Sequence, residues 1–371
     1  MHPTPLWTEE TFHFSGGDYL RRLIELTRAA RFSIRIESYI FELDPRSREL
    51  VEVLGAAAER GVKVRVIIDA IGSYHWGHED FSALFARGVR VRAFGRPRDL
   101  LRDSFRLAIR GHFFRAYQTL RKFQLRDHRK LAVFDSEVAL VGSANIGETF
   151  ERWRETTVEL RGPGVAALRQ SFVKSWRFAN RESIPARDRT LFTPEVRDNF
   201  TSAERRFANR HFLERIRGTE RRLWMTTAYF NPRPKLLLAL FQILDRRMDL
   251  KIIVPMHSDI SWFPWLSRAA FAGLISRGAR VFEYKGPMLH AKSTLFDGRA
   301  FVGSRNMNYR SFMHDLELDV ELESKAAVAS LEAQFAEDLA NSVELTSDRL
   351  RGYRPIAFLV SIGAIPFRRW L

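Results

Sequence analysis

The chain has 371 residues, of which 45% are apolar, including 30 Phe. This length suits two hydrophobic cores, and the composition is sufficient to bury both. The 60 Lys and Arg against 44 Asp and Glu give a formal charge of +16, which favours an anionic partner, either nucleic acid or an acidic membrane surface. The absence of cysteine excludes disulfides and thiolate metal sites.

The two ends of the sequence carry no standard targeting or spanning segment. Residues 1–14 have neither a basic n-region nor an apolar h-region, so we expect no secretory signal and a cytoplasmic protein. No run approaches the ~20 apolar residues that span a bilayer. The nearest candidate, 356–367, is followed by Arg368, Arg369 and Trp370. It suits either an interfacial position or a last element packed on the second domain.

The first half of the chain predicts a strand, a helix and two further strands in that order. These elements are expected at 31–41, 48–61, 62–69 and 88–95. The second half repeats the order. Its elements are expected at 221–230, 235–247, 250–255 and 278–286. The repeat predicts one β-α-β-α-β unit used twice, and Val/Ile runs separated by helices of about 10 to 15 residues predict mainly parallel or mixed sheets covered on both faces.

We therefore expect an α/β protein of two similar lobes related by a pseudo-two-fold axis. The N-terminal lobe is expected over 1–182, the linker over 183–199 and the C-terminal lobe over 200–371. The linker assignment depends on the polar, proline-containing sequence NRESIPARDRTLFTPEVRDN at 180–199.

Two related stretches, RDHRKLAVFDSEVALVGSAN (126–145) and MLHAKSTLFDGRAFVGSRN (288–306), occupy matching places in the two halves. Each predicts two short buried strands joined by a turn, preceded by a His and a Lys that share one strand face. The shared positions are His128, Lys130, Asp135, Gly142, Ser143 and Asn145, and His290, Lys292, Asp297, Gly303, Ser304 and Asn306. A glutamate, Glu155 or Glu317, follows each histidine after 27 residues.

One such His-x-Lys pair alone would be typical of an exposed strand end. Two pairs in a duplicated fold predict a single pocket in which the imidazoles, lysines, serines and asparagines face a phosphoryl group. One histidine can attack phosphorus, while the other protonates the leaving alkoxide and then deprotonates the incoming alcohol or water. Glu155 and Glu317 are expected to fix the histidine tautomers from the second ring nitrogen.

A metal site is the competing interpretation of paired His and acidic residues. The lysines beside both histidines would repel a cation, and the spacings match no usual zinc pattern, so we expect neither a metal nor another cofactor. Asp135 and Asp297 each end an apolar strand before Ser136 or Gly298, as turn residues do. We expect them, with Gly142 and Gly303, to be structural.

The two stretches resemble the paired HKD motifs of the phospholipase D superfamily, and the repeat extends the resemblance over most of the chain. The resemblance implies a bilobed fold with one active site between the lobes, a phosphohistidine intermediate and no metal requirement. It also implies that His128 is the nucleophile and His290 the acid/base, which the sequence itself does not distinguish. Because Arg129 and Ala291 differ between the halves, we expect the two sides of the pocket to be non-equivalent.

Within this superfamily, RDHRKLAVFD (126–135), TAYFNP (227–232) and NYRSFMHDLELDV (308–320) resemble bacterial cardiolipin synthases of the shorter type without an N-terminal transmembrane pair. That implies transfer of a phosphatidyl group from one phospholipid onto the hydroxyl of phosphatidylglycerol or a similar acceptor. Two alternatives stay open. One is a hydrolytic phospholipase or phosphodiesterase in which water replaces the alcohol, and the other is a nuclease of the same chemistry, favoured only by the charge.

The first half carries about 28 extra residues before its histidine, within 96–126, where nine Lys and Arg oppose two Asp. On a helix they would form adjoining basic and apolar stripes. The basic stripe comprises Arg98, Arg102, Arg106 and Arg110, and the apolar stripe Leu101, Phe105, Ile109 and Phe113. We expect this helix to lie in the headgroup region of an anionic membrane, with the protein peripheral on the inner face of the cell membrane. The alternative is an ordinary amphipathic helix packed on the domain. Binding of single-stranded nucleic acid by the same helix is the third possibility.

Overall fold

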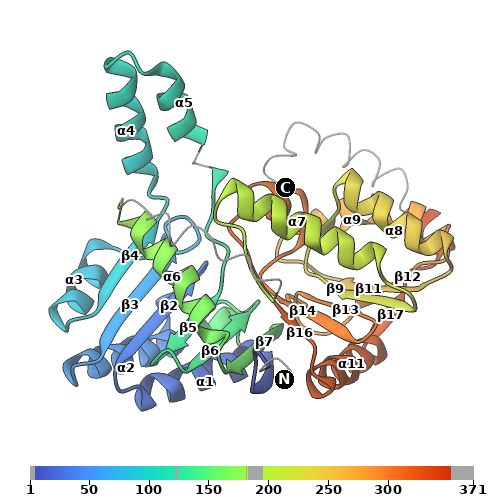
Figure 1. Cartoon of the computed structure of the whole chain (residues 1–371), viewed down its shortest axis with the longest axis horizontal. Coiled ribbons are helices and arrows are strands. Elements are labelled where there is room, and N and C mark those ends of the chain that lie inside the picture. The colour runs from blue at the N-terminus through green and yellow to red at the C-terminus, as the bar shows by residue number, and fades with distance from the viewer. Residues whose placement is uncertain (1–4, 122–123, 181, 183–194, 352–371) are drawn as a thin grey trace.

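The structure is a computed structural model that describes residues 5–121, 124–180, 182 and 195–351, without the side chains of residues 78, 97–99 and 118–121. Two lobes lie side by side, each built on a sheet flanked by helices (Figure 1). The expectation of two similar α/β lobes is confirmed.

The first lobe contains β1 (Glu9–Ser15), α1 (Gly16–Ala29), β2 (Ser33–Ser38), α2 (Pro45–Glu59), β3 (Lys63–Asp69), α3 (His78–Ala86), β4 (Arg90–Phe94), α4 (Pro97–Ile109), α5 (Phe113–Arg121), β5 (Leu131–Phe134), β6 (Val138–Gly142), the 3₁₀ helix η2 (Glu148–Phe150), β7 (Arg154–Arg161) and α6 (Val165–Ala179).

The second lobe contains β8 (Val196–Asp198), α7 (Ser202–Arg217), β9 (Arg222–Thr226), β10 (Phe230–Asn231), α8 (Pro234–Asp245), β11 (Asp249–Pro255), α9 (Phe263–Ile275), β12 (Arg280–Tyr284), β13 (Ser293–Phe296), β14 (Arg299–Gly303), β15 (Met307–Asn308), α10 (Tyr309–Met313), β16 (Leu318–Leu322), α11 (Lys325–Ala340) and β17 (Ser342–Glu344).

Both sheets are mixed. The first has the order β1-β7-β6-β5-β2-β3-β4, and the second β17-β12-β11-β9-β13-β14-β16-β8. Within these two sheets, the parallel pairs are those of β2-β3-β4 and β9-β11-β12, the strands of the repeated units, and the remaining pairs are antiparallel. β10 and β15 form a separate parallel pair. Each HKD stretch supplies an antiparallel hairpin, β5-β6 or β13-β14, beside the first strand of the unit.

Two segments singled out in the sequence fall largely outside the described residues. Of the expected linker, residues 183–194 are not described, whereas β8 near its end pairs with β16 at the edge of the second sheet. The apolar C-terminal stretch 356–367 is not described.

The turn aspartates organise the start of each unit. Asp135, at φ 52°, accepts hydrogen bonds from the backbone amides of Arg31, Phe32 and Ser33 at 2.7 to 2.9 Å. Asp297, at φ 48°, does the same for residues 220–222 at 2.9 to 3.0 Å. Burial raises the pKa of both carboxyl groups, but the three amides outweigh it and lower the pKa overall.

The motif glycines allow close strand approach. A Cβ at Gly142 would lie 2.3 Å from the Thr156 carbonyl oxygen, and one at Gly303 would lie 2.3 Å from that of Leu318. Because such contacts are far inside van der Waals distance, β6 and β14 require glycine where they pass their neighbouring strands.

One hydrophobic core is shared by the two lobes. It joins buried residues of both sheets, among them Val133, Val141, Val158, Leu295, Val302 and Val320. Each lobe has in addition a core of its own on its outer side. The sequence suggested two cores, and the third arises because the antiparallel halves of the sheets pack against each other.

Buried ion pairs also cross between the lobes. Arg154 of β7 forms a 2.8 Å pair with Asp338 of α11. Lys174 of α6 lies 2.8 Å from Asp198 of β8 and 2.7 Å from Glu204 of α7. Because an unpaired buried charge is costly, these pairs penalise any sliding of one lobe against the other.

The basic insertion forms a hairpin that projects from the body, not one helix (Figure 1). The chain breaks at Gly111, whose φ of 77° ends α4 and leaves Phe113 at the start of α5. The two helices pack through small residues, since buried Ser104 Oγ donates to the Ala116 carbonyl at 2.8 Å.

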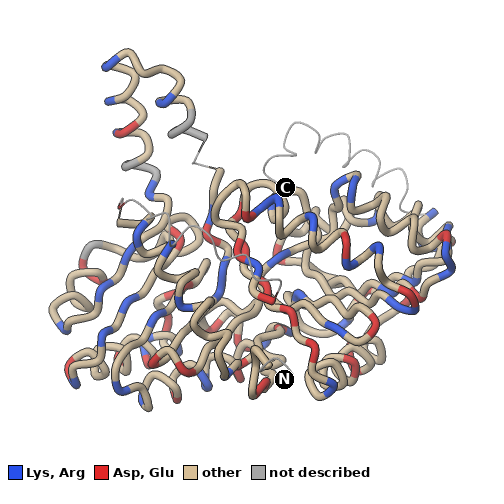
Figure 2. The backbone as a smooth tube through the Cα atoms, viewed as in Figure 1, with Lys and Arg blue, Asp and Glu red and all other residues tan. Residues whose placement is uncertain are grey.

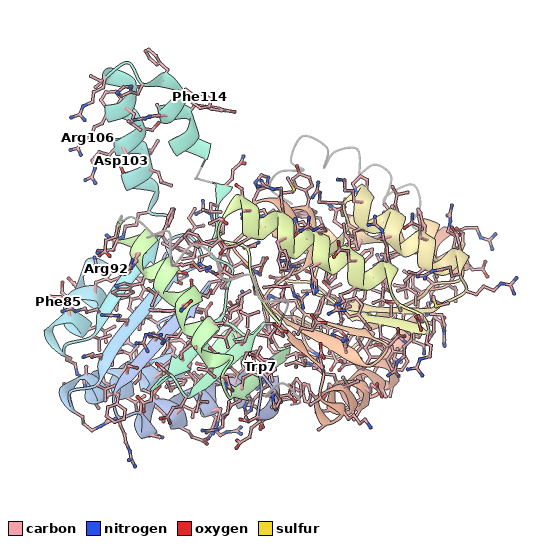
Figure 3. The ribbon with its side chains drawn as sticks, viewed as in Figure 1. Trp7, Phe85, Arg92, Asp103, Arg106 and Phe114 are labelled. Atoms are coloured by element: carbon pink, nitrogen blue, oxygen red, sulfur yellow. The ribbon has the colours of Figure 1, made fainter. Side chains whose placement is uncertain are left out.

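The large apolar side chains of the hairpin face outward. They are 55 to 72% exposed and comprise Leu101, Phe105, Ile109, Phe113, Phe114 and Tyr117. Arg102, Arg106 and Arg110 are exposed on α4, and both helices carry Arg (Figure 2); the Arg98 side chain is not described. Asp103 and Arg106 point away from α4, and Phe114 points away from α5 (Figure 3). No helix among the described residues could cross a bilayer.

Asp135→Asn tests the turn. Asparagine tolerates positive φ and keeps one acceptor, so the variant chiefly loses charge-assisted hydrogen bonds, and we expect the free energy of unfolding to fall by about 2 kcal/mol. Urea denaturation measures this, with exposed Asp245→Asn as the control. Equal stability of the Asp135 variant and the control would contradict the capping role.

Candidate active site

The two HKD stretches meet at one cavity of about 420 Å³ between the lobes. Each histidine lies just before the first strand of its hairpin, β5 or β13, where the chain enters the interior of the sheet. His128 and Asn145 line the cavity from the first lobe, and His290 and Asn306 line it from the second. The predicted meeting of the four side chains is therefore present in the structure.

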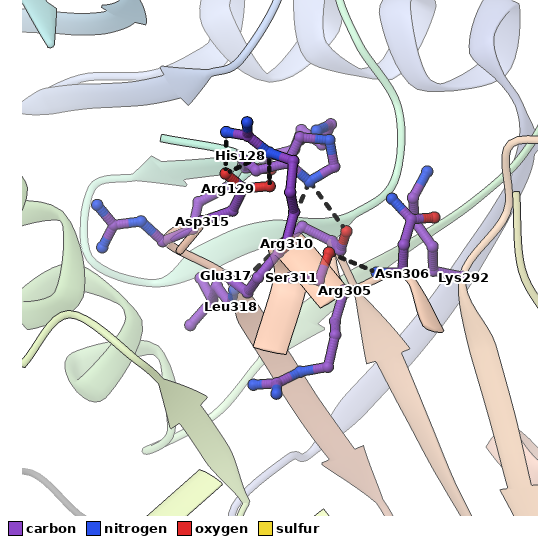
Figure 4. Close-up of polar contacts among 12 residues, drawn as sticks. His128, Arg129, Lys292, Arg305, Asn306, Arg310, Ser311, Asp315, Glu317 and Leu318 are labelled. Carbon is purple, nitrogen blue, oxygen red and sulfur yellow. Dashed lines mark hydrogen bonds and ion pairs between the residues drawn. The ribbon is translucent and has the colours of Figure 1, made fainter. Parts of the chain in front are cut away.

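Each histidine is held by the glutamate of the other lobe. His290 Nδ1 lies 2.8 Å from Glu155 Oε1. His128 Nδ1 lies 3.2 Å from Glu317 Oε2 and 3.1 Å from the Ser304 carbonyl oxygen (Figure 4). A carboxylate on Nδ1 keeps the proton there and leaves Nε2 free to react.

Backbone hydrogen bonds also connect each histidine to the other lobe. The His128 amide donates to the Leu316 carbonyl at 3.0 Å, and the His290 amide donates to the Arg154 carbonyl at 2.8 Å. Each histidine is thus bonded through its backbone to the residue immediately before the glutamate that its side chain contacts. The pairing of a histidine with the opposite glutamate is built into the main chain as well as the side chains.

The serines are not where the sequence suggested. Ser143 and Ser304 were expected to face the phosphate, but both are fully buried. Ser143 Oγ donates to Glu155, and Ser304 Oγ donates to Glu317 Oε2 at 2.5 Å. Each serine directly follows a strand, β6 or β14, that pairs with the strand containing Glu155 (β7) or beginning just after Glu317 (β16). Each serine therefore orients the carboxylate that in turn orients the opposite histidine.

The lysines lie behind the histidines. Lys130 Nζ donates to the His128 carbonyl at 2.8 Å, and Lys292 Nζ donates to that of His290 at 2.5 Å. Burial lowers the pKa of Lys130 to about 8 and that of Lys292 to about 7, against opposing attraction from Glu155 and Glu317. Their charge therefore depends on pH near neutrality.

Asn145 and Asn306 contribute side-chain amides to the lining of the cavity. Asn145 and Asn306 are buried, and within the described part of the chain their Oδ1 atoms have no hydrogen-bond partner. Buried amides normally satisfy their hydrogen bonds, so this arrangement suits groups that bind a ligand.

Arg129 does not make the two sides of the cavity different. The sequence suggested that Arg129 opposite Ala291 would make the cavity asymmetric, but Arg129 is fully buried and bonds away from it. Its guanidinium pairs with Glu37 and Asp127 at 2.9 Å and with Asp198 at 3.5 Å. It therefore ties the motif to the lobe interface.

The two histidine–glutamate pairs differ electrostatically. Burial, reinforced by Lys130, holds the pKa of His128 well below its usual range. Burial also lowers the pKa of His290, but there the Glu155 carboxylate opposes it. The pKa of Glu155 is lowered, because His290, Lys292 and Ser143 outweigh burial, whereas burial raises the pKa of Glu317. His290 therefore has the more firmly ionised partner.

Several cavity residues were not predicted from the sequence as site residues. Tyr39 packs its ring 4.9 Å from that of His128, and Trp153 packs 5.1 Å from that of His290. Tyr229 lies 6.3 Å from His290 and bonds to Asp259. Tyr39 and Tyr229 occupy similar places after β2 and β9, so aligning the two repeats strand by strand would have found this pair.

A second group missed from the sequence lies on the His128 side. Arg310 pairs with Asp315 at 2.6 Å, and its guanidinium also donates to the Gln124 carbonyl, just beyond the hairpin (Figure 4). Both residues line the cavity, with Arg126.

The sequence matches the family model described as cardiolipin synthase, PLD-like domain, over residues 23–176 and 212–339. It is 25% identical to a probable cardiolipin synthase of Bacillus subtilis (strain 168), over 90% of this chain and 66% of that protein. It is 29% identical to cardiolipin synthase A of Pseudomonas aeruginosa, over 92% of this chain and 69% of that protein. The chain spans about two thirds of the length of these relatives.

The fold is shared with solved structures. Phosphatidylserine synthase of Haemophilus influenzae matches with a TM-score of 0.65 and 13% identity, over 91% of this chain and 87% of that one. Polyphosphate kinase of Porphyromonas gingivalis matches with a TM-score of 0.62 and 14% identity, over 96% and 54%. At this identity the likeness concerns the fold alone.

The lysine environments predict a pH-dependent affinity for anions. As pH rises from 6 to 9 through the lowered pKa values, Lys130 and Lys292 lose their charge, so the dissociation constant of sulfate, a dianion throughout, should rise about tenfold or more. Calorimetric titration measures it. Lys130→Met should flatten the pH profile and exposed Lys235→Met should not; a constant affinity in the unaltered protein would contradict the prediction.

Proposed function

The chain belongs to the PLD-like cardiolipin synthase family, whose members are phosphatidyltransferases, and we propose that it forms cardiolipin from phosphatidylglycerol and a second phospholipid, which can itself be phosphatidylglycerol. The observation that carries the proposal is the pair of opposed histidines in one cavity, each with its Nδ1 on a carboxylate.

The reaction would run in two displacements. His128 Nε2 attacks the donor phosphorus, a P–N bond forms, and the P–O bond to the headgroup breaks as His290 gives a proton to the leaving alkoxide. The acceptor hydroxyl then returns a proton to His290 and attacks phosphorus, which breaks the P–N bond. With phosphatidylglycerol as donor, glycerol leaves.

The division of roles rests on the two environments. A nucleophile must be neutral, and the strongly lowered pKa of His128 keeps it so. An acid/base must carry a proton transiently, and ionised Glu155 at 2.8 Å stabilises the imidazolium of His290. Asn145 and Asn306 are proposed to donate to the phosphoryl oxygens, with the lysine charges behind them.

We propose peripheral binding to the inner face of the cell membrane through the hairpin. Its exposed apolar side chains need an apolar medium, and its arginines suit anionic headgroups, which cytoplasmic leaflets carry. The cavity rim offers a second contact, because Ile71 and Trp262 line it and are 42 and 40% exposed. Arg126, a short step beyond α5, connects hairpin and cavity along the chain.

Incubation with phosphatidylglycerol vesicles tests the activity. Mass spectrometry should find cardiolipin and glycerol in equal amounts, and His128→Ala and His290→Ala should each lower the rate by at least about 1,000-fold, since each removes a reacting group. His290→Asn should accumulate a phosphatidyl adduct on His128. Phosphatidic acid as the sole product would favour hydrolysis, and salt-sensitive DNA binding without lipid turnover would favour a nuclease.

Vesicle flotation tests the hairpin. Phe105→Ser with Phe113→Ser should weaken binding to phosphatidylglycerol vesicles by at least about tenfold, because two exposed aromatic rings that would enter the bilayer are lost. Phe85→Ser is the matched control, since Phe85 is 72% exposed on α3 (Figure 3). Equal losses for both variants, or binding indifferent to anionic lipid, would contradict the assignment.

A further inference from the structure

The His290 side of the cavity holds a carboxylate that the proposed reaction does not use. Asp259 lies in the loop between β11 and α9, lines the cavity and is exposed to it. Tyr229 Oη donates to its two oxygens at 2.6 and 2.7 Å, and Ser258 Oγ donates to Oδ1 at 3.0 Å. Within the described residues Asp259 forms no ion pair.

Among the described residues, the His128 side has no equivalent exposed carboxylate. Apart from Glu317, which holds His128, its nearby carboxylates Asp69 and Asp315 are both buried. Asp315 is neutralised by Arg310, whereas Asp69 accepts from the amides of Ile71, Gly72 and Asp127 at 2.9 to 3.0 Å. Among the described residues that line the cavity, Asp259 is therefore the exposed carboxylate without an ion pair, and it lies on the His290 side.

Tyr229 orients this carboxylate. Burial and the neighbouring Asp259 raise the pKa of Tyr229, so its hydroxyl stays protonated and donates throughout the physiological range. The same ring faces His290, as does the ring of Trp153 at 5.1 Å. Asp259 is thus fixed beside the acid/base histidine, next to an aromatic surface on which aliphatic carbons can pack.

The chemistry of the group limits what it can bind. An ionised carboxylate only accepts hydrogen bonds, so its ligand has to bring hydroxyl or ammonium donors. An ammonium would also meet Lys292, which lies behind His290 and interacts electrostatically with Asp259. Like charges at short range disfavour a free cation there, so neutral hydroxyls are the better match.

We infer that Asp259, held by Tyr229, is a specificity-determining residue that binds the non-reacting hydroxyl of a polyol headgroup, such as the glycerol of phosphatidylglycerol, beside His290. The inference rests on the proposed function. Because His290 serves both the leaving and the incoming oxygen, one site would orient glycerol as it departs and phosphatidylglycerol as it arrives. The second hydroxyl on Asp259 would then direct the first towards His290 Nε2.

Binding of soluble headgroups tests the inference without turnover. By calorimetry, glycerophosphoglycerol should bind the full chain more tightly than glycerophosphoethanolamine. Asp259→Asn should weaken the former about tenfold, the scale of one hydrogen bond to a charged group, and Tyr229→Phe should weaken it less. Asp245→Asn is the surface control. Unchanged affinity in Asp259→Asn, or tighter binding of the ethanolamine compound, would overturn the inference.

Acceptor competition separates recognition from chemistry. Glycerol and ethanol both offer a primary hydroxyl, but ethanol lacks a second one. In the Asp259→Asn variant, the rate of phosphatidyl transfer to glycerol should fall about tenfold more than the rate of transfer to ethanol. Equal losses for the two alcohols would mean that Asp259 acts in the chemistry or the fold, and they would overturn the inference. If the unaltered protein transferred to neither alcohol, the proposed function would fail, and the binding comparison would still decide the role of Asp259.

Discussion

The active site depends on an exchange of carboxylates between the lobes. An imidazole can attack or shuttle a proton only if its other nitrogen is held, and here Glu155 holds His290 while Glu317 holds His128. Neither of these two histidines is paired with a carboxylate of its own lobe among the described residues. The lobe interface is held by the shared core, the backbone hydrogen bonds between the lobes and the buried ion pairs. These interactions therefore also keep each glutamate in place to fix the tautomer of the opposite histidine.

Pseudo-symmetry supplies two equal halves, and local substitutions make them unequal. The His128 side matches its carboxylates with a guanidinium and backbone amides, whereas the His290 side leaves Asp259 open. The glutamates that hold the two histidines also differ, because the pKa of Glu155 is lowered and that of Glu317 is raised, so Glu155 is the more firmly ionised. A duplicated fold can therefore assign different roles to equivalent histidines without changing its motifs.

Much of this was predictable from the sequence, because a repeat constrains both fold and site. The lobes, the hairpins at 131–134 and 138–141, and the importance of Glu155 and Glu317 all follow from spacing. Spacing within one lobe does not reveal that each glutamate serves the other lobe, nor that Ser143 turns to its carboxylate. The break at Gly111 and the position of Asp259 depend on loop conformation, which strand and helix periodicity does not encode.

The size of the cavity has a consequence for kinetics. At about 420 Å³ it has room comparable to a small-molecule pocket, enough for a headgroup and its phosphodiester but not for the acyl chains of two phospholipids. In the proposed reaction, the chains would therefore stay in the bilayer during both displacements. The enzyme would respond to the mole fraction of each lipid in the surface it occupies, and diluting phosphatidylglycerol within the membrane would slow it even when the total amount is unchanged.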